Sequence, residues 1–254
     1  MEIEAANISE GWAKAFIAVS EASGKKITPL TVIMDVPEDE SQWERKDIRG
    51  LINGKLQADS HLLNKQVDTV ANTIFAKSIW NKKKPAQVYF DTYMKILPRL
   101  RKASKDNGHG IYFERMIAFN KESKPVNQLG FILKAWEKNI RRKSAFQVAI
   151  FDPQQDHRLQ PYMGFPCLQQ VIFVPLGPSG RNGLMVNAFY ATQYMFEKAY
   201  GNYLGLCRLG TFMAHYMGLK FVRLSCTVGT AELGDHIDGT EAKEMAKKLK
   251  RIIG

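Results

Sequence analysis

The residue best suited to covalent chemistry in this chain is Cys167, one of three cysteines among 254 residues. It follows Pro166 and lies shortly before an apolar run at 171–174 (VIFV) that is typical of a buried strand. A cysteine attacks as the thiolate, and because its usual pKa is about 8.5, its surroundings decide whether it is a nucleophile or an inert core residue. A thiol that follows a proline at the mouth of a buried strand can face a ligand. We therefore expect Cys167 to line a pocket, with simple core packing as the alternative.

The remaining cysteines and histidines form no pattern of a disulfide framework or a metal site. Cys207 and Cys226 are widely spaced, no CxxC occurs, and the five histidines make no HxH or HxxxH pair. An odd number of unpaired cysteines indicates reduced thiols in a cytoplasmic protein. The first residues carry no apolar run of the secretory type, and no stretch is typical of a membrane span. We expect a cytoplasmic protein without a bound metal.

The charge of the chain favours anionic partners. The formal net charge is +11 and the pI about 9.5, a balance that suits nucleotides, nucleic acids and phosphorylated metabolites. Basic residues gather at 82–84, 99–105, 141–143 and 243–251. Each run is more typical of a solvated helix face or loop than of a binding site. The composition alone therefore admits a nucleic-acid partner without requiring one.

The elements that must position Cys167 follow from hydrophobic periodicity. Patterns of helical spacing occur at 8–22, with Ser9 as the expected cap, and at 67–79, 88–102, 126–136, 194–217 and 240–253. Strand patterns occur at 30–36, 146–151, 170–176, 184–190 and 220–228, and the segment 177–183 (GPSGRNG) is predicted to join two of them as a hairpin. The segment 111–119 fits a helix or a strand.

The order of these elements predicts an α+β protein in which helices cover one sheet. The helix at 194–217 is apolar nearly all round, so it belongs in the core. No break in composition divides the chain, and we expect one domain over 1–254. Within it, residues 1–105 form a mostly helical N-terminal region and residues 106–254 contain the core.

The segment 146–233 resembles the thymidylate synthase family, which includes the pyrimidine nucleotide hydroxymethylases. The resemblance rests on motifs in a fixed order that cover roughly a third of the chain. They are Asp152-Pro153 at a strand end, Pro166-Cys167, Asn202-Tyr203-Leu204 in the long helix, 212–219 (FMAHYMGL), and 227–231 (TVGTA), where the family has Thr-Leu-Gly-Asp-Ala. The resemblance implies a thymidylate-synthase-like mixed sheet with a long buried central helix.

The resemblance also implies a chemistry. In the family, a cysteine thiolate adds to C6 of a pyrimidine, and C5 then attacks a one-carbon unit carried by 5,10-methylenetetrahydrofolate. Carried over by position, Cys167 is the nucleophile and Asn202 contacts the base. The family's homodimer implies that Arg141 and Arg142 bind the nucleotide phosphate in the neighbouring subunit. Gln128 corresponds to the family's catalytic glutamate. The expected function is C5 methyl or hydroxymethyl transfer to a pyrimidine nucleotide.

Several positions depart from the family pattern. Residues 191–194 (ATQY) stand where the family has Arg-Ser-x-Asp, 232–234 (ELG) where it has His-x-Tyr, and Leu168 where it has a histidine. An amide at Gln128 cannot exchange a proton as a carboxyl does. The alternative is therefore a catalytically degenerate member that binds a nucleotide or nucleic acid, and the sequence leaves open whether the protein is an enzyme. A third hypothesis is a subunit that docks on a partner protein through the basic helix at 240–254.

Four further residues carry secondary hypotheses. Glu114 and Arg115 pair across a site, with Glu114 supplying the acid missing at Gln128, or they are solvated surface charges. His109 meets a phosphate, or it is a solvated loop residue. His215 is expected to be a satisfied core residue.

Overall fold

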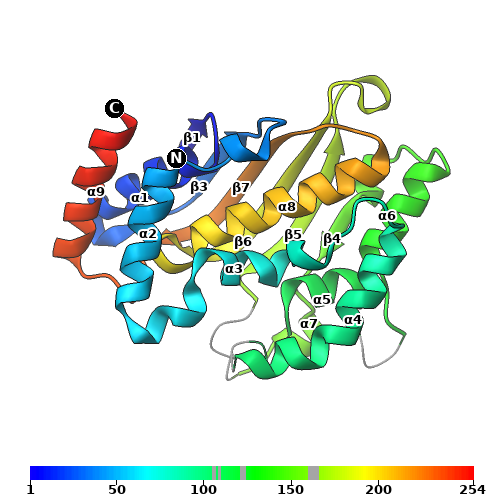
Figure 1. Cartoon of the computed structure of the whole chain (residues 1–254), viewed down its shortest axis with the longest axis horizontal. Helices are drawn as coiled ribbons and strands as arrows, with labels where there is room; N and C mark the ends of the chain where they lie inside the picture. Colours follow the sequence, from blue (N-terminus) through cyan, green and yellow to red (C-terminus); the bar gives the residue numbers. More distant parts are fainter. Residues whose placement is uncertain (105–106, 108–109, 121–123, 160–165) are drawn as a thin grey trace.

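The protein is built on one mixed β-sheet with helices against it (Figure 1). The computed structural model describes residues 1–104, 107, 110–120, 124–159 and 166–254, apart from the side chains of Asn64 and Ser179. The described strands lie in the order β1-β3-β7-β6-β5-β4, and β2 pairs with β7. They are β1 (Glu2–Ala5), β2 (Lys26–Ile27), β3 (Leu30–Asp35), β4 (Gln147–Ala149), β5 (Leu168–Pro175), β6 (Leu184–Tyr194) and β7 (Phe221–Glu232).

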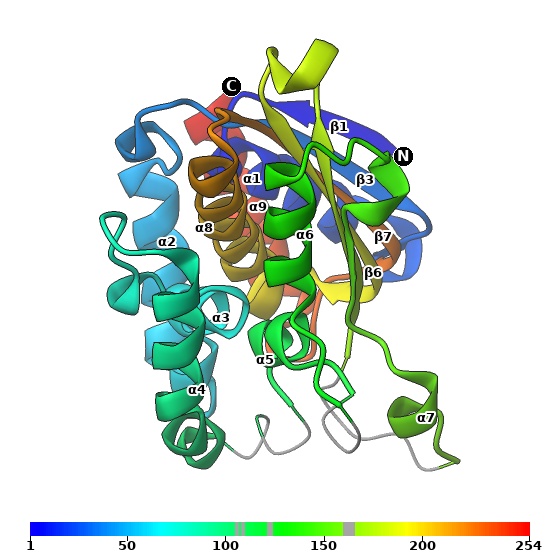
Figure 2. The ribbon, with the colours of Figure 1, turned by 90° about the vertical axis from the view of Figure 1, so that its right-hand side faces the viewer.

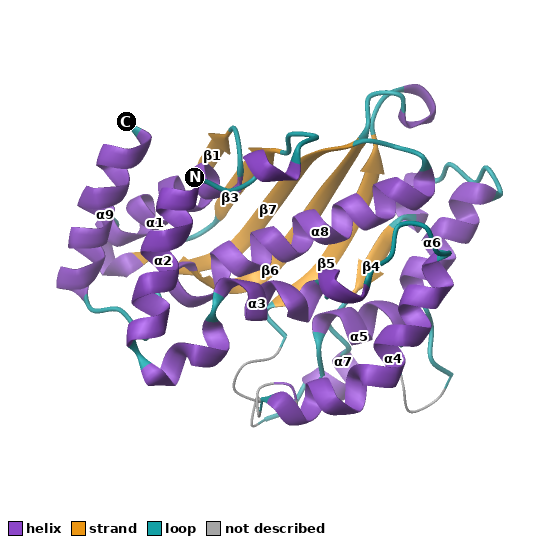
Figure 3. Ribbon diagram, in the orientation of Figure 1, coloured by secondary structure: helices purple, strands orange, loops and turns teal. Residues whose placement is uncertain are grey.

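The helices account for most of the rest of the described chain (Figure 3). They are α1 (Ile8–Glu21), α2 (Lys46–Ala58), α3 (Val67–Ile74), α4 (Ala86–Ala103), α5 (Tyr112–Ile117), α6 (Gln128–Glu137), α7 (Pro153–Asp156), α8 (Tyr200–Met217) and α9 (Gly239–Ile253). The α+β class predicted from the sequence is therefore confirmed. No helix in the described ranges is long and apolar enough to cross a membrane.

Strand pairing is parallel in two places and antiparallel elsewhere. β5 and β6 form the predicted antiparallel hairpin, with Val174 opposite Met185. β6 and β7 are parallel, and α8 connects them by crossing the sheet, as Figure 1 shows. A parallel pair needs such a crossover because both strands start at the same end of the sheet, so the chain must return to that end before the second strand begins. The central helix thus lies across the strands that carry the candidate site.

The two faces of the sheet differ in burial. Side chains on the helix-covered face, such as Phe173, Val186 and Leu224, are fully buried. Their neighbours along the strands point to the other face because side chains alternate along a strand. There Ile172 is only half-buried and Phe189 is 43% exposed. Figure 2 shows the long helices gathered to one side of the strands, which leaves the second face open among the described residues.

The junction between β6 and α8 differs from the prediction of one helix over 194–217. β6 continues to Tyr194 because its last residues pair with β7, with Gln193 opposite Ala231. A π-helix, Met195–Ala199, then turns the chain into α8. The predicted strand 220–228 is likewise too short, since β7 extends to Glu232. Tertiary pairing decides these ends, which local periodicity does not reveal.

Close packing of α8 on α3 depends on two glycines of α8. A Cβ at Gly201 would lie 2.6 Å from the Val70 Cβ, and a Cβ at Gly205 would lie 2.8 Å from the backbone oxygen of Ala71. Neither position has room for a side chain. α8 therefore approaches α3 more closely than larger residues would allow.

Two helix ends were predicted incorrectly. Asn7, not Ser9, caps α1, because its Oδ1 accepts a 3.0 Å hydrogen bond from the N–H of Glu10. The Ser9 hydroxyl is instead buried against the Tyr200 hydroxyl at 2.7 Å. α3 ends at Ile74 rather than continuing to 79, and a separate turn of 3-10 helix follows.

The C-terminal helix α9 is amphipathic, as predicted, and packs on α1. Its buried residues are Ala242, Met245, Ala246 and Leu249. The apolar side of α9 is therefore used within the chain, and only its charged side faces solvent. A partner protein therefore cannot dock on the apolar side of α9, which is already covered by the chain itself.

Candidate functional site

Cys167 lies immediately before β5 and is half-buried. Its carbonyl oxygen accepts a 2.9 Å hydrogen bond from the backbone N–H of Ala191 on β6. The next residue, Leu168, pairs with Tyr190, and the register then shifts before Gln170. The cysteine is thus held at the mouth of the β5–β6 pair, with its thiol neither fully buried nor fully exposed.

Two opposing effects act on the thiol. Burial raises the pKa of Cys167 above its usual value, while the ammonium of Lys198 lowers it. Burial is the larger effect, so the thiol holds its proton more tightly than an exposed cysteine does. Without a ligand, Cys167 is therefore mainly protonated at neutral pH.

Tyr112, at the start of α5, lies beside this thiol. Burial raises the pKa of its phenol, as does the nearby Cys167, and backbone hydrogen bonds at Leu168 and Cys167 act in the opposite direction. The sequence analysis did not single out Tyr112 or Lys198. Tyr112 lies 55 positions before the cysteine, and no local pattern connects the two. Lys198 could have been found from the sequence, because it precedes Asn202 by four residues in a segment predicted to be helical.

Several buried polar atoms near this end of the sheet have no hydrogen-bond partner in the described part of the chain. They are the hydroxyls of Tyr190 and Tyr203 and both amide atoms of Gln193. Gln193 is only 2% exposed and lies two residues beyond Ala191. Buried polar groups are normally satisfied, so unsatisfied ones mark places where water or a ligand belongs. These hydroxyl and amide groups can therefore form further hydrogen bonds with water or a ligand near Cys167.

Asn202 lies in the first turn of α8 and is 4% exposed. It follows Lys198 by four residues, which places both side chains on one side of the helical turn. Its amide carries a donor and an acceptor, as reading the edge of a planar base requires. The fold thus brings Asn202, Lys198 and Cys167 to the same end of the sheet.

The side chain of Gln128 has a structural role, because it binds main-chain groups of two neighbouring elements. Its Nε2 donates to the backbone oxygens of Arg115 and Ala149, at 3.0 and 2.8 Å, and its Oε1 accepts from the N–H of Ala149 at 2.9 Å. These bonds join the start of α6 to β4 and α5. Both hydrogens of Nε2 are used by main-chain oxygens and Oε1 accepts from a main-chain N–H, which leaves the amide little capacity for a substrate.

Arg141 and Arg142 lie far from Cys167 in the same chain. The Arg141 guanidinium stacks on Trp136, 3.8 Å from the ring centroid, and donates to the backbone oxygen of Trp136 at 2.8 Å. Trp136 in turn donates to the backbone oxygen of Met217, at the last turn of α8. Asn202 occupies the first turn of that helix, about 22 Å away at 1.5 Å per residue.

The two arginines are held differently. Arg142 donates from Nε to the Ser144 hydroxyl at 2.9 Å, and both arginine side chains are exposed. The structure does not bring this pair to the candidate site within one chain.

Glu114 and Arg115 are buried, so the hypothesis that they are solvated surface charges is wrong, and each forms an ion pair with a residue of another element. Glu114 is 3% exposed and binds Arg101 on α4. Arg115 is 8% exposed and pairs with Asp156, with a 2.8 Å bond from Nη2 to Oδ1. These charges are buried because each has a partner from another element, which the sequence could not reveal.

The histidine hypotheses have different outcomes. His215 is exposed rather than in the core, and its Nε2 lies 3.0 Å from the backbone oxygen of Lys82. The last turns of α8 face solvent on that side, which the apolar pattern of the helix obscured. His109 lies outside the described residues. Among those described, no three His, Cys, Asp or Glu side chains gather as a metal site requires.

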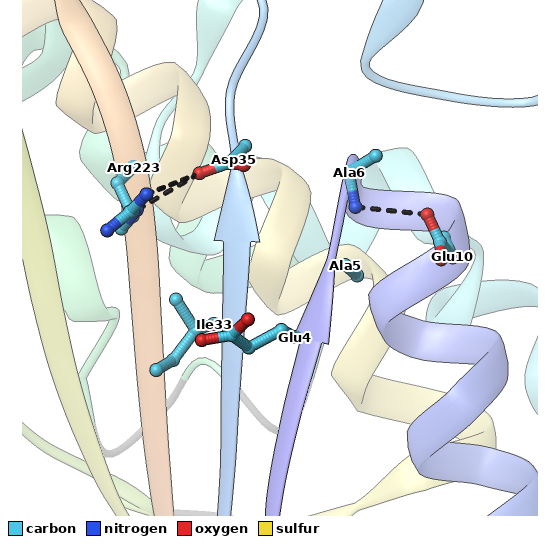
Figure 4. Close-up of a pocket in the computed structure, with 7 residues that line it drawn as sticks. All are labelled: Glu4, Ala5, Ala6, Glu10, Ile33, Asp35 and Arg223. Carbon is cyan, nitrogen blue, oxygen red and sulfur yellow. Dashed lines mark hydrogen bonds and ion pairs between the residues drawn. The ribbon is translucent and has the colours of Figure 1, made fainter.

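A surface depression lies at the opposite edge of the sheet, between β1, β3 and the start of α1 (Figure 4). Glu4, Glu10 and Asp35 line it with Arg223, and Arg223 donates to Asp35 at 3.0 Å. Its acidic residues are exposed or paired with neighbouring cations. The depression shares no residue with the surroundings of Cys167.

Comparison with known proteins identifies no family for the chain. It matches no family model, and it matches no curated protein. The resemblance to thymidylate synthases therefore stays a prediction.

Proposed function

We propose that this protein is a thymidylate-synthase-like transferase that modifies C5 of a pyrimidine nucleotide through Cys167. The observation that carries the proposal is the half-buried thiol at the mouth of β5, beside the ammonium of Lys198 and the phenol of Tyr112. A mixed sheet crossed by a long buried helix supports the same interpretation.

The proposed reaction uses the sulfur as a temporary substituent on the ring. The Cys167 thiolate bonds to C6, and the electron pair of the C5–C6 double bond moves to C5 and the adjoining carbonyl. C5 would then form a bond to the methylene carbon of the folate and lose its proton. The bond from that carbon to the folate nitrogen would break, and the exocyclic methylene left on C5 would accept water in hydroxymethyl transfer or a hydride from the folate in methyl transfer. Departure of the thiolate restores the double bond and returns Cys167 to its starting state. Asn202 holds the base edge throughout, because its buried amide can donate and accept.

The proposal names a methylene-folate as the one-carbon donor. A bound folate supplies a carbon at the oxidation level of formaldehyde. The buried amide of Gln193, whose two polar atoms have no partner among the described residues, fits the polar edge of such a heterocycle. Tyr194, which follows it, contributes a half-buried aromatic ring at the same end of β6.

The proposed assembly is a homodimer formed through the open face of the sheet. Ile172, Met185 and Phe189 lie on that face only partly covered, which suits a symmetric apolar interface. A second copy would also supply the phosphate-binding arginine that residues 191–194 lack. Arg142 is the better candidate, since Arg141 is engaged with Trp136 of its own chain.

Release of tritium from the C5 position of labelled pyrimidine nucleotides tests the reaction. With methylene-folate present, we expect release by the wild-type protein and by Cys207→Ser, and none by Cys167→Ser. Cys207 is a matched control because it is a fully buried thiol on α8. Absence of release with both uracil and cytosine nucleotides would contradict the proposal.

The alternative is a nucleotide- or nucleic-acid-binding protein without turnover. Two observations favour it: burial keeps the Cys167 thiol protonated, and the Gln128 amide is occupied by the main chain. Binding to single- or double-stranded nucleic acid that weakens steeply with salt would support it, because phosphate contacts release counterions. Under this alternative, Cys167→Ser leaves binding unchanged.

A further inference from the structure

Two basic segments that are far apart in the sequence lie beside the last turn of α8. The first is 82–84 (KKK), in the loop before α4, and the second is 141–143 (RRK), in the loop after α6. α6 and the last turns of α8 lie at the end of the molecule that faces the viewer in Figure 2. Contacts with α8 bring both segments to this end.

The first segment is held in place by two side chains of α8. The Tyr216 hydroxyl donates to the backbone oxygen of Lys84 at 2.6 Å, and the Nε2 of His215 lies 3.0 Å from the backbone oxygen of Lys82. These contacts use main-chain oxygens, and all three lysines of the segment are exposed. The loop therefore presents three cations from a fixed position.

The second segment is attached to the same turn of α8 through Trp136 on α6. The Trp136 indole donates to the backbone oxygen of Met217, the residue after Tyr216, at 2.8 Å. The Arg141 guanidinium stacks on that indole, 3.8 Å from the ring centroid, and Lys143 is exposed. The two basic segments therefore flank one helix end.

The other basic runs of the chain are partly neutralised by its own carboxylates. Arg101, in the run 99–105, pairs with the buried Glu114. Lys250, in the run 243–251, pairs with Glu21 at 2.6 Å. Some of the positive charge of these runs is therefore already used within the fold.

The lysines beside the end of α8 keep most of their charge available. Lys83, Lys84 and Lys143 form no ion pair within the described ranges, and Lys82 lies 3.6 Å from Glu40. Like charges that the fold holds close together create a positive potential, which attracts an anionic partner. This end of the molecule is therefore the better docking surface for an extended anion.

The aromatic rings at this end are already covered by cations. The Lys82 ammonium lies 5.3 Å from the Trp80 ring centroid, and Arg141 covers Trp136. Proteins that bind single strands stack the bases on free aromatic rings. These two rings are engaged within the chain, so the surface suits phosphates better than unstacked bases.

We propose that the segments 82–84 and 141–143 form one surface that binds the phosphate backbone of double-stranded nucleic acid. Basic side chains on phosphates supply affinity that does not depend on sequence, and each contact releases counterions. Binding at this surface uses no residue near Cys167, so it is independent of the proposed C5 chemistry.

The test is fluorescence anisotropy of a labelled duplex of about 20 base pairs, titrated with the full chain between about 0.05 and 0.2 M salt. We expect the wild-type protein to bind, with an affinity that falls with salt. The triple variant Lys83→Gln, Lys84→Gln, Lys143→Gln should weaken binding about 10- to 100-fold and make the slope of log K against log salt shallower by about 2–3. Arg142 stays in place, because the proposed function assigns it to the nucleotide phosphate.

The matched control is the triple variant Lys243→Gln, Lys247→Gln, Lys248→Gln. It removes the same total charge from exposed positions of α9 and should leave affinity and slope nearly unchanged. Acetylation of lysines in the wild-type protein, mapped by mass spectrometry, gives a readout without any substitution. The duplex should protect the peptides that contain 82–84 and Lys143 and leave those of α9 reactive.

Three results would overturn the proposal. They are equal weakening by the two triple variants, no binding of the duplex by the wild-type protein at about 0.05 M salt, and tighter binding to a single strand or to vesicles of phosphatidylserine and phosphatidylcholine. Tritium release from C5 is a separate readout. Its absence alongside normal duplex binding would contradict only the proposed transferase activity.

Discussion

The backbone N–H of Ala191 donates a 2.9 Å hydrogen bond to the carbonyl oxygen of Cys167. This bond joins the start of β5 to the part of β6 that continues, without its β5 neighbour, into the π-helix and α8. The position of the thiol is therefore set by the same strand that leads to Lys198 and Asn202. A displacement of β6 would move all three together.

The contact between α8 and α3 predicts opposite effects for two Gly→Ala changes. Gly205→Ala should reduce the free energy of unfolding by about 1–3 kcal/mol, because the new methyl group meets the backbone of Ala71. Gly54→Ala, in the exposed part of α2 with nothing nearby, should increase it by about 0.4–1 kcal/mol. Urea unfolding of both variants measures the difference. Equal effects would mean that α8 does not approach α3 as described.

The buried ion pair of Arg115 and Asp156 should contribute strongly to stability. Asp156→Ala leaves the Arg115 guanidinium buried without this partner and also removes the acceptor of the Asp152 N–H, at 2.7 Å. We expect a loss of about 3–5 kcal/mol in the free energy of unfolding. Asp47→Ala, which breaks an exposed pair with Arg45, should cost less than about 1 kcal/mol. A small effect at Asp156 would show that the pair is open to water.

Two buried tyrosines on α8 should respond differently to loss of their hydroxyls. Tyr203→Phe removes a hydroxyl with no described partner, so stability should change by less than about 0.5 kcal/mol or rise. Tyr200→Phe removes the hydroxyl that bonds Ser9 at 2.7 Å and should cost about 1 kcal/mol. Thermal and urea unfolding report both. A clear loss in Tyr203→Phe would reveal an ordered water on that hydroxyl.

Stability should fall in mildly alkaline solution. Burial raises the pKa values of the Cys207 and Cys226 thiols, both fully buried. Above about pH 8.5 the unfolded chain releases these protons while the folded chain keeps them, so the unfolded state binds fewer protons. The free energy of unfolding then decreases by about 1.4 kcal/mol per pH unit for each thiol.

Urea unfolding between pH 7 and 9.5 measures this dependence. Cys207→Ala should show a shallower decrease than the wild-type protein, because one titrating thiol is gone. Below pH 8 the two proteins should show no difference in slope. A wild-type stability that rises through this window would contradict the burial of these thiols.

The sequence predicted the elements of the fold better than their ends. The run 30–36 and the hairpin at 177–183 correspond to β3 and the β5–β6 turn, because local apolar runs and turn residues determine both. The boundary at Tyr194 was placed wrongly because pairing with β7 extends the strand. Such pairing joins residues about 40 positions apart, so no local pattern contains it.

The surroundings of Cys167 could be predicted only in part, for the same reason. Cys167 and Asn202 were recognisable from their motifs, and the fold places both at one end of the sheet. The contribution of Tyr112 depends on the docking of α5, and the burial of Glu114 depends on Arg101 from α4. These contacts are long-range, and residue types alone do not reveal them.

The most direct test of the central claim is intact-protein mass spectrometry after incubation with a 5-fluoro pyrimidine nucleotide and methylene-folate. Fluorine at C5 cannot leave as a proton does, so the sulfur–C6 bond should persist. We predict one stable adduct per chain, mapped to the peptide that contains Cys167, in the wild-type protein and in Cys207→Ser. Cys167→Ser should form none. Unmodified wild-type protein with both uracil and cytosine analogues would contradict the account.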